Sequence, residues 1–383
     1  MTDQQPKRVL VVVGTRPEAI KMAPVVEALE AEEGIEVRLA LTGQHTDLVD
    51  QVLAAFSVSA SYELGIMKEG QTLYDVVQRA LDGLRGVVSE WKPDALLVQG
   101  DTATVFVGAL VGFFEKVKVG HVEAGLRSHD KWAPWPEEIF RRMTDVLSDW
   151  YFAPTRRSLD ALVAEGIPAE RVNVTGNTVV DALHSVGSMD RAIEDEALTR
   201  VIDGDRRLVL LTAHRRESFG APIREALTAV RTLIDEFEDV EVVYPVHPNP
   251  NVLEPAREIL GDHPRIHLSA PFGYLDLVAA LRAASLVLTD SGGIQEEAPT
   301  FGAPVLVLRD VTERPEGVDA GVAQLVGTDA ERILEAGRAV LSGDTSRSAV
   351  SNPYGDGAAA RRIADIVAAD LTGRSRRTED WAG

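Results

Sequence analysis

The sequence predicts an α/β protein of two doubly wound domains, each built on a parallel sheet. Short apolar runs rich in β-branched residues alternate with longer segments of helical periodicity, which is the rhythm of βαβ units. The rhythm stops and restarts near the middle of the 383-residue chain, and this length suits two ordinary domains. We therefore expect domains at 1–172 and 173–355, followed by a last segment at 356–383.

Each strand expected in the first half is a short apolar run that a turn residue or a helix-start signal follows. The first run, Arg8 to Val13, ends at Gly14. Pro17 suits the first turn of the next helix, because the N–H that proline lacks would be unpaired there anyway. A second helix is expected near Gln44 to Phe56. The remaining strands are expected at Val37 to Leu41, Ala95 to Gln99, Val117 to Val122 and Trp150 to Ala153.

The second half repeats this pattern after a connection expected near 172–182 and an acidic helical stretch, Asp190 to Asp203. A last stretch of helical periodicity, Ala358 to Leu371, could belong to either half. The polar tail after Gly373 is expected to fray. The second set of strands is expected at Leu208 to Thr212, Val240 to Val246, Ile266 to Leu268, Leu286 to Thr289 and Val305 to Leu308.

Two such domains facing each other would form a cleft at the carboxyl ends of both sheets. Open α/β sheets bind their ligands there, just outside the strand ends. Side chains that carry chemistry are therefore expected in the loops that follow strands.

The charge balance argues against several classes of partner. The chain has 60 Asp and Glu against 39 Lys and Arg, a net charge of −21, which disfavours nucleic acid or an anionic membrane as the main partner. The seven lysines all precede residue 132, and the chain has no cysteine. Excess acid, scarce lysine and absent cysteine together resemble the composition of proteins from salt-loving microbes. The alternative is an ordinary acidic cytoplasmic protein.

Other classes are disfavoured by missing patterns. Without cysteine there are no disulfides, thiolate metal sites or cysteine nucleophiles. No run approaches 18 apolar residues and the first residues lack the pattern of a signal peptide, so we expect a cytoplasmic protein. No GxGxxG follows a strand and the eight histidines show no HExxH spacing, so no dinucleotide cofactor and no metal are expected.

The loop after the first strand predicts an anion site. Gly14 permits a tight turn, and Arg16 and Lys21 add positive charge near the free N–H groups of a helix N-terminus. Such a site suits a phosphate or a developing negative charge. The alternative is a plain helix start with surface cations.

A second loop of this kind follows Asp290. Ser291 suits the N-cap of a helix, and Gly292 and Gly293 would let backbone N–H groups approach a ligand closely. Glu296, a turn further on, could accept hydrogen bonds from two ribose hydroxyls. The alternative is a capped helix whose glutamates compensate the helix dipole.

Acids also stand where strands of the first half end or helices begin. Asp101 follows a buried strand and could be an N-cap, while Glu137 and Glu138 could be first-turn acids that the helix dipole stabilises. Glu123 is harder to explain this way, because a carboxylate in an apolar run needs a partner. Acids gathered at one sheet edge opposite anion sites are what acid–base chemistry on a bound substrate requires.

His214 follows the first strand of the second half, with Arg215 and Arg216 behind it. A histidine there can donate to a phosphate or act as an acid near neutral pH, and arginines form bidentate pairs with phosphates. The alternative is a structural loop histidine beside a local Arg–Glu pair. His247 is expected to be structural.

These loops resemble, in order from residue 9 to about residue 316, the non-hydrolysing UDP-N-acetylglucosamine 2-epimerases. The fold that the resemblance implies is GT-B-like, with two Rossmann-like domains and a last helix that crosses back to the first. The matching segments are Gly14-Thr15-Arg16-Pro17-Glu18 with Lys21, Thr42-Gly43-Gln44-His45, Gln99-Gly100-Asp101-Thr102, His121-Val122-Glu123-Ala124-Gly125-Leu126-Arg127, Pro134-Trp135-Pro136-Glu137-Glu138, Thr212-Ala213-His214-Arg215-Arg216-Glu217, Asp290-Ser291-Gly292-Gly293-Ile294-Gln295-Glu296-Glu297-Ala298-Pro299 and Glu313-Arg314-Pro315-Glu316.

The resemblance implies interconversion of UDP-GlcNAc and UDP-ManNAc at sugar carbon 2 by a homodimer without a redox cofactor. UDP leaves first, giving 2-acetamidoglucal, and adds again after a proton returns to the opposite face. The implied catalytic residues are Asp101, Glu123, Glu137, His214 and Lys21. The implied substrate contacts are Arg16, Lys21, Asp101, Glu123, His214, Phe272, Leu277, Ser291, Gly292, Gly293, Glu296 and Arg314.

Four positions depart from the family pattern, two of them at a second binding site. Phe140 and Ser218 each stand where the family usually has Asn. Bacterial members bind a second UDP-GlcNAc as activator, and Gln44 and His45 match that site. Asp47 and Gly70 replace the Gln and Arg that are usual there.

Other functions stay open on the sequence. The nearest is a 2-epimerase of the same family that acts on a modified UDP-hexosamine, such as a diacetamido uronic acid. A hydrolysing member would release free ManNAc, and a glycosyltransferase of GT-B fold would share the UDP-binding half without needing three clustered acids. A nucleotide-sugar sensor would keep the phosphate and ribose contacts and lack the acids.

Overall fold

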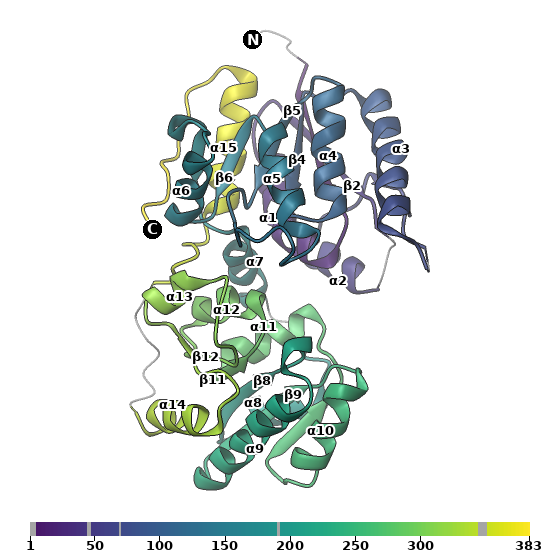
Figure 1. Ribbon diagram of the computed structural model, residues 1–383. Coiled ribbons are helices and arrows are strands. Elements are labelled where there is room, and N and C mark those ends of the chain that lie inside the picture. The colour runs from purple at the N-terminus through teal and green to yellow at the C-terminus, as the bar shows by residue number, and fades with distance from the viewer. Residues whose placement is uncertain (1–4, 44–46, 69, 190–191, 344–350) are drawn as a thin grey trace. The chain divides into compact units, whose positions relative to one another are not determined.

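The computed structural model describes residues 5–43, 47–68, 70–189, 192–343 and 351–383. These residues form two compact units, which we call unit 1 (residues 1–182 and 354–383) and unit 2 (residues 183–353). Each unit is built on one parallel sheet with helices on both faces (Figure 1). The predicted α/β class with two parallel-sheet domains is therefore confirmed.

The described part of unit 1 contains a seven-stranded sheet in the order β3-β2-β1-β4-β5-β6-β7. The chain order reverses between β1 and β4, which is the kind of switch point where open sheets bind ligands. The strands are β1 (Lys7–Val13), β2 (Ile35–Leu41), β3 (Tyr62–Glu63), β4 (Ala95–Gln99), β5 (Lys118–Val122), β6 (Trp150–Ala153) and β7 (Val172–Val174).

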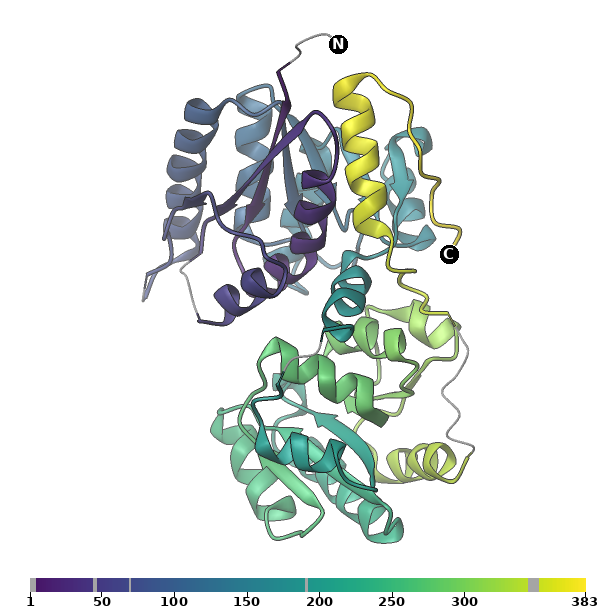
Figure 2. The same cartoon turned by 180° about the vertical axis from the view of Figure 1, so that it is seen from behind.

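The helices of unit 1 cover both faces of this sheet. Figures 1 and 2 show α3, α4, α5 and α6 over one face and α1 with the C-terminal helix α15 over the other. The helix α7 begins in unit 1 and ends in unit 2. The helices are α1 (Arg16–Glu30), α2 (Asp47–Ala55), α3 (Leu73–Trp91), α4 (Ala103–Phe114), α5 (Glu137–Leu147), α6 (Arg156–Ala164), α7 (Thr178–Gly187) and α15 (Ala359–Thr372).

The described part of unit 2 contains a six-stranded parallel sheet in the order β10-β9-β8-β11-β12-β13, with its switch point between β8 and β11. The strands are β8 (Arg207–Thr212), β9 (Val240–Pro245), β10 (Ile266–Ser269), β11 (Ala284–Thr289), β12 (Val305–Val307) and β13 (Ala323–Leu325). The helices are α8 (Glu196–Ile202), α9 (Ala221–Glu236), α10 (Pro250–Leu260), α11 (Tyr274–Ala283), α12 (Gly292–Glu297), α13 (Pro315–Asp319) and α14 (Ala330–Ser342).

The central strands form because their runs are apolar on both faces. In β1 every residue from Val9 to Val13 is buried, as expected for a parallel strand with helices on each side. The helix that follows has Thr15 at its N-cap, where the hydroxyl accepts from the Glu18 N–H, and Pro17 lies in its first turn. The predicted strand-to-helix sequence at this sheet edge is thus realised.

The C-terminal tail differs from the expectation that it frays. Trp381 is only 8% exposed, and its N–H donates to the carbonyl of Val174 at 2.8 Å. Asp365 on α15 accepts from the backbone N–H of Arg377 and Thr378, each at 2.7 Å, and pairs with Arg374 at 2.6 Å. One buried carboxylate therefore holds the tail against unit 1, which a polar composition alone does not reveal.

Among the described residues, no helix is long and apolar enough to cross a membrane.

Candidate functional site

Glu123, directly after β5, lies at the centre of a polar group in unit 1. The residue as a whole is 7% exposed, and Lys21 Nζ lies 2.7 Å from Oε1 and 2.9 Å from Oε2 of its carboxylate. The Gln99 amide donates to Oε2, and Asn177 Nδ2 donates to Oε1 at 3.1 Å. These residues come from α1, β4 and the loop after β7, so tertiary structure supplies the partner that a buried carboxylate needs.

The backbone of Glu123 is also unusual. Its φ is +69°, in the left-handed region that side chains other than glycine rarely adopt. Such a conformation costs of order 1–3 kcal/mol and is found mostly at functional sites. It persists here because Lys21, Gln99 and Asn177 around the carboxylate and the strand behind it fix the residue.

Asp101 lies in the neighbouring loop after β4. It pairs with Arg141 of α5, and the N-cap of α4 is Thr102, so the interpretation of Asp101 as a helix cap is wrong. A Cβ placed on Gly100 would lie 3.9 Å from Glu123 Oε2, which puts the two acidic loops next to each other.

Glu137 and Glu138 open α5 and differ in their surroundings. Glu138 is fully buried and accepts from the N–H groups of Ser128 at 2.9 Å and His129 at 3.2 Å, so it shapes the loop before the helix. Glu137 is half-buried, and no hydrogen bond links its side chain to another residue among those described.

The first turn of α1 carries a buried acid, Glu18, for which no role was predicted from the sequence. Glu18 is 3% exposed and accepts from Gly14 N–H at 2.6 Å and from the Thr15 hydroxyl at 3.0 Å. Burial, with a smaller contribution from the charge of Asp101, raises its pKa to about 7. The signal for it was the Thr-x-x-Glu capping pattern at Thr15.

Gly14 is needed for a reason other than the predicted tight turn. A Cβ on it would lie 2.6 Å from Thr104 Oγ1 and 3.0 Å from Thr42 Oγ1, so the loop passes too close to its neighbours for any side chain. Arg16, two residues on, is half-buried at the first position of α1.

A buried network behind the acids supports the loop of Asp101. His121 is fully buried, with Nε2 2.8 Å from the Gly100 carbonyl and Nδ1 2.6 Å from Asp145 Oδ1. Arg127 Nη2 lies 2.7 Å from Asp145 Oδ2. Burial alone would raise the pKa of the Asp145 carboxyl, but the His121 ring and the Arg127 guanidinium hold it below its usual value. His121 and Arg127 belong to one of the matching segments, and no role was predicted for either from the sequence.

In unit 2 the predicted residues gather beyond β8 and β11. Asp290, 1% exposed, accepts from the N–H groups of His214 and Arg215, both at 2.7 Å, and so joins the two loops at the switch point. Its second oxygen lies 3.6 Å from His214 Nδ1. The His214 ring stacks on His247 with centroids 5.9 Å apart, and its side chain is 44% exposed.

The loop Ser291-Gly292-Gly293 leads into α12. Ser291 stands at the N-cap of α12, as predicted, although its hydroxyl makes no capping hydrogen bond. A Cβ on Gly292 would lie 2.8 Å from Glu313 Oε1, the end of a flexible side chain, so Glu313 would have to shift to admit a side chain there. Glu296 is 2% exposed and paired with Arg314, so two residues from separate motifs lie together.

The remaining predicted residues divide into two groups. Phe272 and Leu277 are half-buried and pack against an apolar cluster of unit 2 that includes Ile294 of α12. Gln44 and His45 lie outside the described residues. No group of residues that could hold a metal ion occurs in the part of the chain that the structure describes.

Two residues that depart from the family pattern, Phe140 and Ser218, are buried. Phe140 is 9% exposed and its ring stacks on Phe106 with centroids 5.4 Å apart, so it joins α5 to α4. Ser218 is 7% exposed in a short 3-10 turn after β8.

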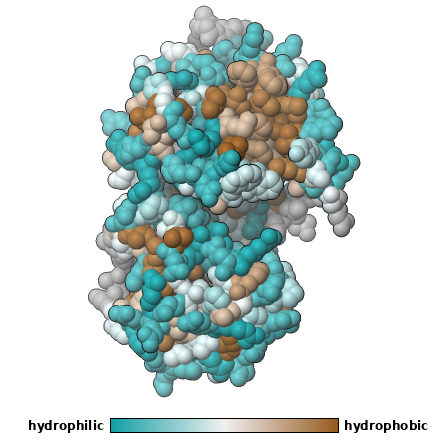
Figure 3. Space-filling view, in the orientation of Figure 1, coloured by the Kyte–Doolittle hydropathy of each residue, from teal (hydrophilic) through white to brown (hydrophobic). Residues whose placement is uncertain are grey.

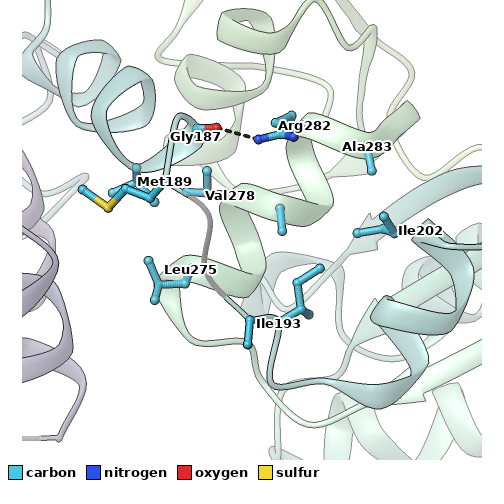
Figure 4. A pocket seen from close by; sticks show the side chains of 11 residues that line it. Gly187, Met189, Ile193, Ile202, Leu275, Val278, Arg282 and Ala283 are labelled. Atoms are coloured by element: carbon cyan, nitrogen blue, oxygen red, sulfur yellow. Dashed lines mark hydrogen bonds between the residues drawn. The ribbon is translucent and has the colours of Figure 1, made fainter.

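Unit 2 also has an apolar pocket of about 320 Å³ that lies apart from these loops (Figure 4). Side chains of α7, α8 and α11 line it, among them Val186, Ile202 and Val278. Arg282 Nη1 donates to the Gly187 carbonyl at 2.6 Å at its edge. Its described lining contains none of the residues predicted for the site.

Comparisons with known proteins are consistent with the motifs. The family model for UDP-N-acetylglucosamine 2-epimerase matches residues 27–368. The chain is 45% identical over 381 residues to the UDP-N-acetylglucosamine 2-epimerase of Bacillus subtilis, covering 98% of this chain and 99% of that protein. To the Escherichia coli enzyme of the same name it is 46% identical over 368 residues, covering 94% and 98%. The crystal structure of UDP-GlcNAc 2-epimerase from Neisseria meningitidis bound to UDP-GlcNAc matches with a TM-score of 0.84 and 40% identity, over 96% of this chain and 100% of that one.

Proposed function

Because the chain belongs to the UDP-N-acetylglucosamine 2-epimerase family, we propose that it interconverts UDP-GlcNAc and UDP-ManNAc. The observation that carries the proposal beyond family membership is the buried Glu123 carboxylate, held by Lys21 and two amides beside the loop of Asp101. A carboxylate kept in place this firmly suits proton transfer at a carbon centre.

The chemistry follows from the substrate. The proton on carbon 2 is not acidic, because no carbonyl lies next to that carbon within the ring. Breaking the bond from carbon 1 to UDP while the carbon 2 proton leaves gives UDP and 2-acetamidoglucal. Return of a proton to the opposite face of carbon 2, with UDP adding again to carbon 1, gives the epimer. Electrons and atoms balance without a redox cofactor.

In this scheme the acids of unit 1 move the protons. Asp101, Glu123 and Glu137 are the groups we assign to removal and return of the carbon 2 proton, and the Lys21 ammonium keeps Glu123 ionised. The surroundings of Asp101 and Glu137 differ, so the two acids can take different roles. Asp101 pairs with Arg141, whereas Glu137 is half-buried without a described hydrogen bond.

The residues of unit 2, with Arg16 of unit 1, are assigned to UDP. His214 and Arg314 would stabilise the negative charge that develops on the departing diphosphate, together with the backbone N–H groups after Ser291. Glu296 would accept from the ribose hydroxyls. Because Glu296 and Arg314 are paired here, UDP binding has to share or replace that contact.

Incubation with UDP-GlcNAc in deuterium oxide, followed by proton NMR, tests the activity. We expect UDP-ManNAc to accumulate with deuterium at carbon 2 of both sugars. Free ManNAc would instead identify a hydrolysing enzyme. Absence of exchange on UDP-GlcNAc, with turnover of a diacetamido uronic acid analogue, would identify the modified-substrate alternative.

Substitutions test the residue assignment. Asp101→Asn, Glu123→Gln and Glu137→Gln should each lower kcat by about 10²–10⁴-fold, the contribution of a positioned acid or base, and leave UDP affinity intact. Glu115→Gln, at an exposed acid that ends α4, is the matched control and should keep full activity. A variant that keeps full turnover removes its residue from the catalytic set.

We also propose that the protein acts as a homodimer through an apolar face of unit 1. Exposed side chains on α4 and α5 form this face: Phe113 (60% exposed), Phe114 (61%), Met143 (42%) and Val146 (82%). Figure 3 shows a broad apolar area over the region where Figure 1 places α4. Val146→Glu should yield monomers in light scattering, whereas Val311→Glu, at a valine of unit 2 that is 70% exposed, should not.

Finally, we propose that the net charge of −21 reflects a salty cytoplasm. Salt shortens the range of repulsion between surface carboxylates, from about 8 Å at 0.15 M to about 3 Å at 1 M. Activity and Tm should therefore rise between about 0.15 M and 1 M KCl. A Tm that falls over this range would assign the acidity to an ordinary cytoplasm.

A further inference from the structure

Asn177 lies in the loop between β7 and α7, a segment that the sequence analysis treated only as a connection. Its side chain is 3% exposed. One end of the amide reaches the Glu123 carboxylate, with Nδ2 3.1 Å from Oε1. The other end caps the next helix, with Oδ1 accepting from the Val179 N–H at 3.1 Å.

The orientation of this amide follows from its neighbours. The reverse orientation would place the amide oxygen against a carboxylate and the NH₂ group against a backbone N–H, and both contacts would be repulsive. Asn177 therefore donates to Glu123. A donor on a carboxylate oxygen favours the ionised form of the acid and fixes the direction of its free lone pairs.

The backbone of Asn177 ties this contact to a second part of the chain. Its N–H donates to the carbonyl of Tyr354 at 2.7 Å, and Tyr354 is the residue at which the chain re-enters unit 1. Four residues on, Asp181 accepts from the N–H groups of Ala359 at 3.2 Å and Ala360 at 2.8 Å. The outgoing and returning segments are thus bonded together at Asn177.

We propose that Asn177 is a positioning residue for proton transfer by Glu123, and that it holds this carboxylate ionised and aimed from the place where the chain leaves and re-enters unit 1. The inference rests on the proposed function, because it assigns Asn177 a part in the same reaction. Lys21 supplies charge to the carboxylate and Gln99 holds its other oxygen, so Asn177 completes a three-sided support. Among the contacts that the structure describes, the titratable groups facing the carboxylate are Lys21 of α1 and, past Gly100, Asp101.

The two ends of the amide can be separated by substitution. Asn177→Asp keeps the shape and the oxygen that caps α7, but it replaces the donor to Glu123 with a second negative charge. Asn177→Ser keeps a hydroxyl suited to capping and removes the donor without adding charge. Asn173→Asp, on β7, is the matched control, because the side-chain oxygen of Asn173 already accepts from Arg376 at 3.1 Å.

The experiment measures kcat and KM for UDP-GlcNAc against pH, with Tm and UDP affinity for each variant. For Asn177→Asp we expect kcat to fall about 10- to 100-fold, as for loss of one hydrogen bond to a charged group, with KM and UDP affinity unchanged. The acid limb of the kcat profile should move to higher pH, because a carboxylate beside a new negative charge gains a proton more easily. Asn177→Ser should show a smaller loss, and Asn173→Asp none.

The outcomes separate this inference from the proposed function. If the wild type shows no exchange or epimerisation, the proposed function fails. If the wild type turns over and Asn177→Asp matches it in kcat and pH profile, the positioning role is refuted. A fall in Tm with kcat and KM changed together and no shift of the acid limb would refute it equally, since that pattern is the one a purely structural cap produces.

Discussion

Replacing Lys21 with methionine tests the central contact of the site. Lys21→Met keeps most of the side-chain volume and removes the ammonium that contacts both oxygens of Glu123, at 2.7 and 2.9 Å. The pair is largely withdrawn from solvent, with side-chain exposures of 16% for Lys21 and 5% for Glu123. The variant therefore leaves a buried carboxylate without its counter-charge.

The size of the effect follows from that burial. Removing one partner of a buried ion pair costs about 3–5 kcal/mol of unfolding free energy. The amides of Gln99 and Asn177 remain as donors, so we expect the lower end, about 3 kcal/mol. Unit 1 spans roughly 200 residues, for which 1 kcal/mol corresponds to about 2–4 °C, so its Tm should fall by about 6–12 °C.

Calorimetry and urea denaturation measure this, with Lys7→Met as the matched control. Lys7 pairs with Asp94 at 3.0 Å, but both side chains are more than a third exposed, and such pairs contribute about 0–1 kcal/mol. Adding Glu123→Gln to Lys21→Met should recover much of the lost stability, because the uncompensated charge is then gone. If Lys21→Met is no less stable than Lys7→Met, the buried pair of Lys21 and Glu123 does not stabilise unit 1.

Three further predictions follow from burial and close approach. The pKa of Glu18 is about 7 in the folded state, against about 4.5 in the unfolded state. Between these pH values the folded state binds more protons, so the free energy of unfolding falls as pH rises from about 4.5 to about 7. Glu18→Gln should remove this pH dependence from urea denaturation curves. Gly14→Ala should cost about 1–3 kcal/mol through its clash and abolish most turnover, whereas Gly86→Ala, in open space on α3, should stabilise by about 0.5–1 kcal/mol. Trp381→Ala should lower the free energy of unfolding by about 3–5 kcal/mol, measured by calorimetry. Trp132→Ala is the control and should change it little, because Trp132 is 67% exposed. Equal effects of the two substitutions would contradict an ordered tail.

The strands were the most predictable part of the fold. β4 and β6 begin and end where the apolar runs do, because parallel strands buried on both faces need continuous apolar side chains. Three short edge strands, β3, β7 and β13, were not predicted. Each has two or three residues, which is too short for an alternating or apolar pattern to stand out.

The site was predictable as a set of loops and less so as a set of contacts. Glu123 was singled out because a carboxylate in an apolar run needs a partner. No pattern near Glu123 indicates that this partner is Lys21, which is 102 residues away in the sequence. Glu18 and Asn177 were passed over, because a capping glutamate and a linker asparagine read as local structure. Glu18 comes near Asp101, and Asn177 comes near Glu123, only when the strands have paired.

The α/β class, the strand-end loops and the types of side chain they carry follow from local patterns in the chain, because apolar periodicity and turn residues act between near neighbours. Tertiary structure alone decided which charges meet. It pairs Lys21 with Glu123, Arg141 with Asp101 and Arg314 with Glu296, and it pairs Arg374 of the polar tail with Asp365. The physical reason is that parallel pairing brings distant strand ends to one edge, where burial makes each carboxylate depend on a partner that no local pattern specifies.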